Sequence, residues 1–321
     1  KDIPEGGSKA VLLVKPKADH ERALKGSINA FLDLLVTEDE EHEDVSKYVI
    51  SYYKPEEIIY LGPDENMTNE LIVWTQKQAE KRGYKYYRAF MSSKPKDGIN
   101  HKEYGVTSEG LHVYVEHVLK YLDIDPLKQK FTVKMTGGPD GDVAGNELKI
   151  LESKYRKTCQ VVAIADGLGA AFDPNGLDWG ELLSLVKSNK SIVEFDQSKL
   201  SSKTDAFVIG IDTVENLEKR NKLHSYAKAD LFIPAGGRPY SVREENVEDF
   251  FLSSGKMSCR AIVEGANIFF TEKARDILQN EGVVMIKDSS ANKTGVICSS
   301  FEIISSLVLE QDEFLSFKST Y

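Results

Sequence analysis

Two clusters of glycines, residues 137–145 and residues 167–171, follow apolar runs and have the residue types that can hold a phosphate group. A phosphate loop must lead into a helix whose first N–H groups point at the anion. Residues 142–153 can form such a helix, whereas the turn residues at 173–176 block one after the second cluster. We therefore predict a phosphate loop at the first cluster. Its expected contacts are Gly138, Gly141, Asp142 and Val143.

An acidic residue, Asp166, ends the apolar run that follows the expected loop helix. In dinucleotide-binding folds an acid at this place accepts hydrogen bonds from the adenosine ribose hydroxyls. A carboxylate there would also repel a 2′-phosphate, which favours NAD over NADP as the cofactor. The alternative is an aspartate that caps a turn. Neither glycine cluster satisfies the strict G-x-G-x-x-G pattern, and the spacing from Gly138 exceeds the usual ~20 residues.

The elements that must position these residues form an alternating pattern from residue 131 onward. Short apolar runs recur at 131–135, 160–165, 207–211, 231–233, 260–263 and 283–286. Helical patterns lie between most of them, as at 182–186 and 273–278, and a last helix is expected at 296–309. Strands that alternate with helices predict parallel βαβ units in a doubly wound, Rossmann-type sheet.

The first third of the chain has a different pattern, which predicts a separate part of the fold. Helices are expected at 20–36, 68–82 and 106–122, and short strands at 10–14 and 57–62. The acidic run at 38–44 is expected to be a solvated loop. We predict an α/β protein of two domains. A Rossmann-type domain spans residues 125–292, and a smaller α/β substrate-side domain spans residues 1–124 and is completed by residues 293–321.

Composition excludes several classes of protein. The 321 residues carry a net charge of -10, which argues against a nucleic-acid partner. No stretch approaches the ~20 apolar residues of a membrane span. The three cysteines, Cys159, Cys259 and Cys298, are far apart, which argues against a disulfide framework or a zinc site and favours a reducing compartment, the cytoplasm or the mitochondrial matrix. The six histidines form no H-E-x-x-H motif, so we expect no catalytic metal.

Several motifs, in their order along the chain, resemble the glutamate dehydrogenase family. They are Pro4-Glu5-Gly6-Gly7-Ser8-Lys9, Gly62-Pro63-Asp64, Thr107-Ser108-Glu109-Gly110, the glycine loop with Asp166, Ile233-Pro234-Ala235, Val263-Glu264-Gly265-Ala266-Asn267 and Ala291-Asn292-Lys293-Thr294-Gly295. The stretch Gly236-Gly237-Arg238-Pro239 resembles the large NAD-specific branch of that family. Together the motifs cover nearly the whole chain.

The resemblance implies a reaction and a role for each matching residue. The reaction is reversible oxidative deamination of L-glutamate with NAD to 2-oxoglutarate, ammonium and NADH, in a homo-oligomer. Lys9 and Asp64 would be catalytic. Gly6, Gly7 and Ser299 would bind the substrate. Thr107, Asn267 and Asn292 would bind the cofactor near its nicotinamide.

Other interpretations stay open. A lysine after a Gly-Gly turn is usually solvated, an aspartate after Gly-Pro usually belongs to a turn, and a serine such as Ser299 in a helix usually packs. The chain does not begin with Met and does not contain the family's upstream substrate lysines, so we expect a fragment. The alternatives are a related dehydrogenase acting on leucine, valine or phenylalanine, and a nucleotide-binding module without turnover.

Overall fold

The computed structural model describes residues 10–36, 48, 50, 57–63, 67–202 and 204–320. These residues divide into two compact units. The first unit is Gly105–Gly295, and the second consists of the described residues up to Tyr104 together with those from Val296 onward. Among the described residues, no helix is both long enough and apolar enough to cross a membrane.

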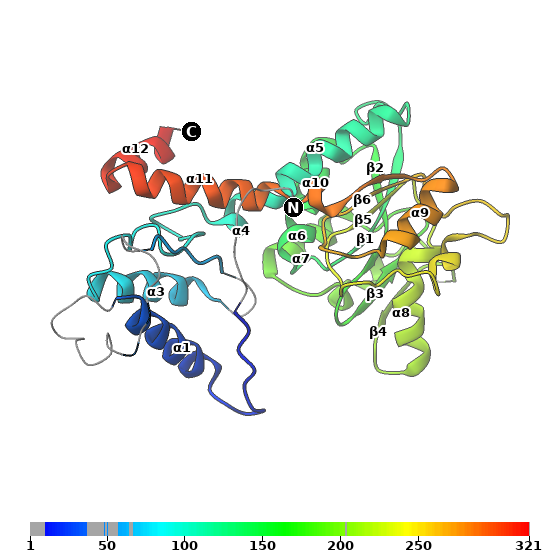
Figure 1. Ribbon diagram of the computed structural model, residues 1–321. Helices are drawn as coiled ribbons and strands as arrows, with labels where there is room; N and C mark the ends of the chain where they lie inside the picture. The colour runs from blue at the N-terminus through cyan, green and yellow to red at the C-terminus, as the bar shows by residue number, and fades with distance from the viewer. Residues whose placement is uncertain are drawn as a thin grey trace. The chain divides into compact units, whose positions relative to one another are not determined.

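A seven-stranded sheet in the order β4-β3-β2-β1-β5-β6-β7 forms the centre of the first unit (Figure 1). The strands are β1 (Phe131–Thr136), β2 (Cys159–Ala165), β3 (Gly169–Phe172), β4 (Phe207–Gly210), β5 (Leu231–Pro234), β6 (Ala261–Val263) and β7 (Val284–Ile286). Strand β3 is antiparallel to both neighbours, and the other adjacent pairs are parallel. The order changes direction between β1 and β5, which is where doubly wound sheets bind ligands. The predicted Rossmann-type α/β fold is confirmed.

Helices cover both faces of this sheet. They are α5 (Val106–Tyr121), α6 (Asp142–Tyr155), α7 (Trp179–Ser188), α8 (Val214–Tyr226), α9 (Glu272–Asn280) and the short α10 (Asp288–Ala291), with 3-10 turns η2 (Ile192–Glu194), η3 (Gln197–Lys199) and η4 (Val247–Phe250). Buried side chains of α5, α6 and α7 share one core cluster with the sheet. Buried side chains of α8 and α9 belong to two clusters on the opposite face.

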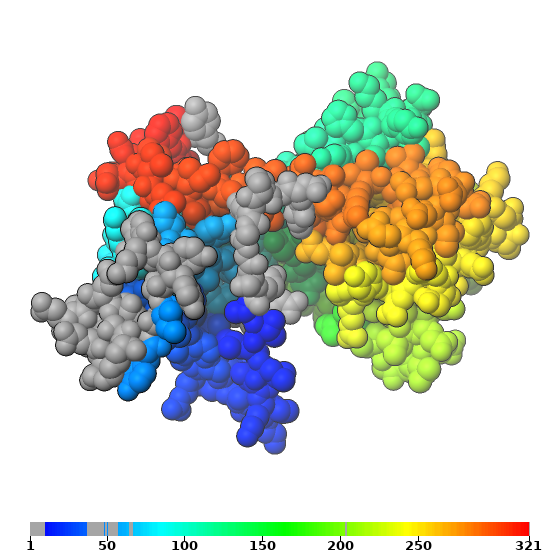
Figure 2. Space-filling model, in the orientation of Figure 1, coloured from blue at the N-terminus to red at the C-terminus, as the bar shows by residue number. Residues whose placement is uncertain are grey.

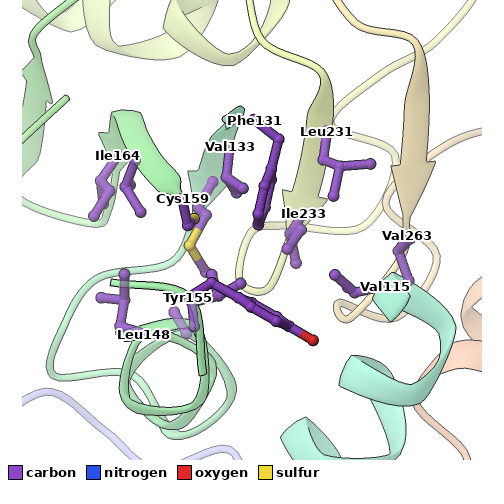
Figure 3. Packing of buried hydrophobic residues seen from close by; sticks show 14 of the residues in the cluster. Val115, Phe131, Val133, Leu148, Tyr155, Cys159, Ile164, Leu231, Ile233 and Val263 are labelled. Carbon is purple, nitrogen blue, oxygen red and sulfur yellow. The ribbon is translucent and has the colours of Figure 1, made fainter. Parts of the chain in front are cut away.

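The strand side chains alternate between these two layers of core. Leu231 and Ile233 of β5 pack into the cluster of α5 and α6, whereas Phe232 packs into the cluster of α9. Figure 3 shows side chains of the first cluster, among them Val115 and Phe131, converging between strands and helices. Because both faces are covered, most strands are rich in apolar residues, and these apolar runs were detectable in the sequence.

The second unit is helical in the residues described. Its helices are α1 (His20–Leu35), α3 (Asn69–Lys81), α4 (His101–Tyr104), most of α11 (Thr294–Val308) and α12 (Gln311–Thr320). Helices α1 and α3 share a small core that includes Leu32, Ala79 and Phe90. The buried Glu302 of α11 accepts a hydrogen bond from the Ser93 N–H at 3.0 Å and lies 3.2 Å from Lys94 Nζ, which ties the segment before α4 to α11.

Two expectations for this part of the chain are wrong. The strands expected at 10–14 and 57–62 do not form; within these ranges the structure has only an isolated bridge between Leu61 and Met91. The apolar side chains of Val11 and Leu13 are 85% and 98% exposed, because no neighbouring strand pairs with this segment in the described residues. The two compact units divide at Gly105, whereas the expected domain boundary is residue 125, and α5 packs on α6 and on the sheet.

Candidate functional site

The first glycine cluster forms the connection between β1 and α6. Strand β1 ends at Thr136, and α6 begins at Asp142 with Gly141, which has no side chain, at its N-cap. The first turn of α6 therefore presents backbone N–H groups beside the carboxyl end of β1. This arrangement binds anions such as a pyrophosphate. The prediction that the first cluster, and not the second, leads into a helix is confirmed.

Two loop residues must be glycine because a Cβ at either position would lie too close to neighbouring atoms. Gly137 has φ 93°, and a Cβ there would lie 2.9 Å from the backbone nitrogen of Gly236. A Cβ on Gly138 would overlap the carboxylate of Asp166 and would lie 2.5 Å from Asp140 Oδ1. Side chains at either position would push the loop away from its neighbours, so the close approach requires glycine.

The second glycine cluster is part of the sheet. Its last three residues, 169–171, begin β3, and a Cβ on Gly169 would overlap the carbonyl oxygen of Ile209 in the adjacent β4. The small residues here let two antiparallel strands approach each other, which is a packing role.

Asp166 lies at the end of β2 beside the loop, where an acid was predicted. Its Oδ1 accepts hydrogen bonds from the N–H groups of Leu168 (2.9 Å) and Gly169 (3.0 Å). Its Oδ2 accepts bonds from Ser191 Oγ and from the Ile192 N–H, both at 2.7 Å. The side chain is buried, and these four donors occupy the positions at which a carboxylate accepts hydrogen bonds. A ribose hydroxyl would therefore have to displace a donor of this chain.

A cation lies beside Asp166. The Arg220 guanidinium of α8 donates through Nε to the main-chain oxygen of Asp166 at 2.6 Å. Burial lowers the pKa of Arg220, and the Asp166 charge opposes that shift. The negative charge of Asp166 and the positive charge of Arg220 thus lie at the carboxyl end of β2. The adenosine end of a dinucleotide would be held there.

Asn267 and Asn292, from two motifs far apart in the sequence, are in direct contact. The buried Asn292 Nδ2 donates to the carbonyl oxygen of Gly265 at 2.8 Å and to Asn267 Oδ1 at 3.0 Å. Asn267 itself is exposed. The pair places amide groups, which can both donate and accept hydrogen bonds, at the ends of β6 and α10.

Thr107 occupies the first turn of α5 and is half-buried. The hydroxyl of the next residue, Ser108, donates to the Val143 carbonyl oxygen in the first turn of α6 at 2.9 Å. A Cβ on Gly110 would overlap the side chain of Thr294, so α5 also packs closely against the segment after α10. Thr107, the loop helix and the second asparagine motif are thus held together within one unit.

A buried ion pair supports the Asn267 motif, and the sequence-based predictions missed it. Glu264 at the end of β6 receives two hydrogen bonds from Arg275 of α9, Nε to Oε1 at 2.7 Å and Nη2 to Oε2 at 2.8 Å. Burial raises the pKa of Glu264, and the hydrogen bonds from Arg275 oppose that shift. Glu264 was visible as the first residue of the Glu-Gly-Ala-Asn motif, but its partner lies on the following helix and no pattern links the two.

Of the predicted residues on the substrate side, the structure describes Ser299. Ser299 lies on α11, partly buried, in the second unit. Lys9, Gly6, Gly7 and Asp64 lie outside the described residues. The structure therefore brings together the cofactor-binding candidates of the first unit, and the roles of the substrate-side candidates stay predictions.

Comparison with known proteins places the chain among amino-acid dehydrogenases. Residues 98–316 match the model of the family described as Glutamate/Leucine/Phenylalanine/Valine dehydrogenase. A "Probable NAD-specific glutamate dehydrogenase" of Schizosaccharomyces pombe is 38% identical over 329 residues, which covers 98% of this chain and 28% of that protein. The NAD-specific glutamate dehydrogenase of Neurospora crassa is 37% identical over 98% of this chain and 30% of its own length. The chain spans about three tenths of the length of these curated relatives.

Solved structures with the same fold are also glutamate dehydrogenases. The hetero-hexameric glutamate dehydrogenase of Thermus thermophilus has a TM-score of 0.62 at 19% identity, covering 96% of this chain and 62% of that chain. The enzyme of Plasmodium falciparum has the same TM-score and identity and covers 94% of this chain and 58% of that chain. At this level of identity the likeness shows the fold.

Proposed function

The chain belongs to the Glutamate/Leucine/Phenylalanine/Valine dehydrogenase family, and we propose that it carries the NAD-binding part and some of the substrate-binding part of an NAD-dependent glutamate dehydrogenase. The proposed reaction is the reversible oxidative deamination of L-glutamate to 2-oxoglutarate and ammonium. The names of the relatives that match nearly the whole chain support glutamate and NAD.

One observation carries the proposal. The glycine loop with the N-terminus of α6 and the contact between Asn267 and Asn292 form two polar regions in the same unit. A dinucleotide needs both, since its pyrophosphate requires N–H donors and its carboxamide requires amide-type partners. NAD bound there would supply the acceptor for the hydride of the substrate α-carbon. Thr107, Asn267 and Asn292 would orient the carboxamide so that one face of the ring meets the substrate.

The choice of NAD over NADP is proposed to depend on the charge of Asp166. Because its oxygens accept four hydrogen bonds from this chain, the negative charge itself would disfavour a 2′-phosphate. The neighbouring Arg220 weakens this repulsion, so the discrimination is a balance between two opposite charges.

The chemistry at the substrate is assigned by the motifs. Asp64 would move a proton between the amine and solvent, since hydride leaves more readily when the amine is neutral. Lys9 would assist the attack of water on the imine and stabilise the developing oxyanion. Ser299, with the backbone at Gly6 and Gly7, would hold the substrate.

The last two proposals concern assembly and location. We propose a homo-oligomer, as the family resemblance implies; the structural neighbour from Thermus thermophilus is also an oligomer, described as hetero-hexameric. We propose a reducing compartment, the cytoplasm or the mitochondrial matrix, because the three cysteines are free thiols.

The test of the function is formation of NADH, followed by its absorbance, when L-glutamate and NAD are added to this chain. We expect turnover that is selective for L-glutamate over L-leucine and for NAD over NADP. Preference for L-leucine or NADP would contradict the proposal. If this chain is silent, the same assay on the full-length product of the gene decides, and silence there would leave a nucleotide-binding module as the function.

A further inference from the structure

The residue after Asn267 has an unusual backbone conformation. Ile268 has φ 45°, in the left-handed region that β-branched residues rarely adopt. Its side chain is 43% exposed, so burial of the isoleucine does not explain the conformation. A backbone in this region persists only when its surroundings determine it, and such residues gather at functional sites.

Two hydrogen bonds hold the backbone of Ile268. Its N–H donates to Asp288 Oδ2 at 2.7 Å, and its carbonyl oxygen accepts from the Tyr240 N–H at 2.7 Å. The segment around residue 240, yellow in Figure 2, lies beside the segment around residue 268, orange in the same view, and Val242 forms a bridge with Phe270. Of the two partners, Asp288 is the one that acts through a side chain.

The Asp288 carboxylate is itself fixed. It is buried, and its Oδ1 accepts from the Ser289 N–H at 2.8 Å and lies 3.9 Å from Arg275 Nη2. Arg275 cannot swing away because it makes the two-point contact with Glu264. Asp288 therefore presents its Oδ2 to Ile268 from one defined position.

Resting on the proposed function, we propose that Asp288 is a positioning residue for the nicotinamide end of the cofactor. Its carboxylate holds Ile268 in the left-handed conformation, which directs the side chain of Asn267 to Asn292 and to the carboxamide. Asp288 does not touch the cofactor in this role. It acts through the backbone of Ile268 on the residue before it.

The experiment measures binding of two ligands to the chain by titration. NADH contains the nicotinamide, and ADP-ribose lacks it but keeps the pyrophosphate and adenosine. We expect Asp288→Ala to weaken NADH binding about tenfold, the effect of losing support for one strained residue, and to leave ADP-ribose binding unchanged. Asp288→Asn keeps an acceptor oxygen for the Ile268 N–H and should bind NADH within about twofold of wild type.

Substitution of Ile268 by glycine should rescue the NADH binding that Asp288→Ala weakens. Glycine adopts a positive φ without strain, so in an Ile268→Gly background Asp288→Ala should weaken NADH binding by no more than about twofold. Glu272→Gln is the matched control, because Glu272 pairs with Arg275 at 3.1 Å on the exposed side of the same network and does not contact Ile268. It should leave both affinities unchanged.

Each outcome of these titrations supports or overturns the positioning role of Asp288. Equal weakening of NADH and ADP-ribose by Asp288→Ala, no weakening of NADH, or an undiminished effect in the glycine background would overturn the positioning role. If Asp288→Ala fails to fold, a large loss of NADH affinity in the folded Asp288→Asn variant would overturn it as well. A wild-type chain that binds neither ligand would instead contradict the proposed function, and the positioning role with it.

Discussion

The Asp166 carboxylate joins the turn after β2 to Ser191, which lies 25 residues further along the chain. Its two oxygens serve two different segments, since Oδ1 faces Leu168 and Gly169 whereas Oδ2 faces Ser191 and Ile192. Removing one acceptor oxygen should therefore release one of the segments.

We predict that Asp166→Asn lowers the free energy of unfolding by about 3 kcal/mol, because an amide NH2 group would face N–H or O–H donors in a buried site. The midpoint of urea unfolding measures this change. The neutral amide should also lower the ratio of the NADH affinity to the NADPH affinity, measured by titration. Asp178→Asn is the control, because asparagine and aspartate are about equally good N-caps and Asp178 caps α7. An unchanged unfolding midpoint in Asp166→Asn would contradict the structural role.

The sequence indicated Asp166 and left two roles open, a ribose acceptor and a turn cap; its bonds from the N–H groups of Leu168 and Gly169 are those of a turn cap. Its place after an apolar strand was visible, as was the glycine loop, because both are local patterns. Its partners Ser191 and Ile192 are brought in by the fold from a distant segment, so the saturation of its oxygens could not be foreseen. The same holds for Asp288, whose partner Ile268 is 20 residues away.

At the scale of elements, β1 contains a charged residue in the middle of the sheet. Lys134 is fully buried, and its Nζ donates to Ser258 Oγ at 2.7 Å and to the Ala227 carbonyl oxygen at 2.8 Å. Its ammonium also lies near the rings of Phe232 and Phe250. Burial lowers the pKa of Lys134 from 10.5 to about 8.

This shift predicts a pH dependence of stability. Between about pH 8 and pH 10.5 the unfolded chain binds more protons at Lys134 than the folded chain, so the free energy of unfolding rises with pH across that window. Lys134→Met lacks this contribution. The stability of wild type relative to Lys134→Met should therefore rise by about 3 kcal/mol from pH 7 to pH 10.5.

Urea unfolding of both proteins at several pH values checks the prediction. Groups that titrate in both proteins and do not interact with Lys134 cancel in the difference, whereas Cys259 does not cancel fully because the Lys134 charge lowers its pKa. Lys228→Met, at an exposed lysine, serves as the control for replacing a lysine by methionine. A pH-independent difference for Lys134→Met would show that the ammonium is not held at a lowered pKa.

The sequence predicted the elements unequally well. Apolar runs located six of the seven strands, because strands of a sheet covered on both faces are mostly apolar. Strand β3 was missed because Gly169, Ala170 and Ala171 are small and form no apolar run. Helix α8 has no strong apolar stripe and was not named. The strands expected at 10–14 and 57–62 had apolar residues but no neighbouring strand.

At the scale of the molecule, the cofactor-binding candidates and the sheet lie within Gly105–Gly295, a continuous segment. It contains Thr107, the glycine loop, Asp166, Asn267 and Asn292 together with its own two-layered core. We predict that this segment, produced alone, folds and binds ADP-ribose with an affinity within about tenfold of the whole chain, because the residues proposed to contact the pyrophosphate and the adenosine all lie within it.

Far-UV circular dichroism and cooperative urea unfolding would test whether the segment folds, and calorimetric titration would test binding. The whole chain, measured beside it, is the control. A segment that unfolds without cooperativity would show that the sheet unit needs the second unit for its stability. A folded segment that does not bind ADP-ribose would show that the second unit contributes a contact.

The three cysteines differ in their exposure to solvent, which decides which of them a reagent can label. Cys159 and Cys259 are each 2% exposed, whereas Cys298 is partly exposed on α11, next to Ser299. Burial raises the pKa of Cys298, and the nearby charge of Glu302 adds to that shift. A maleimide dye used sparingly at mildly alkaline pH should therefore label the native chain at Cys298. The natural sequence thus offers a fluorescent reporter beside the serine proposed to bind the substrate, without any engineered cysteine.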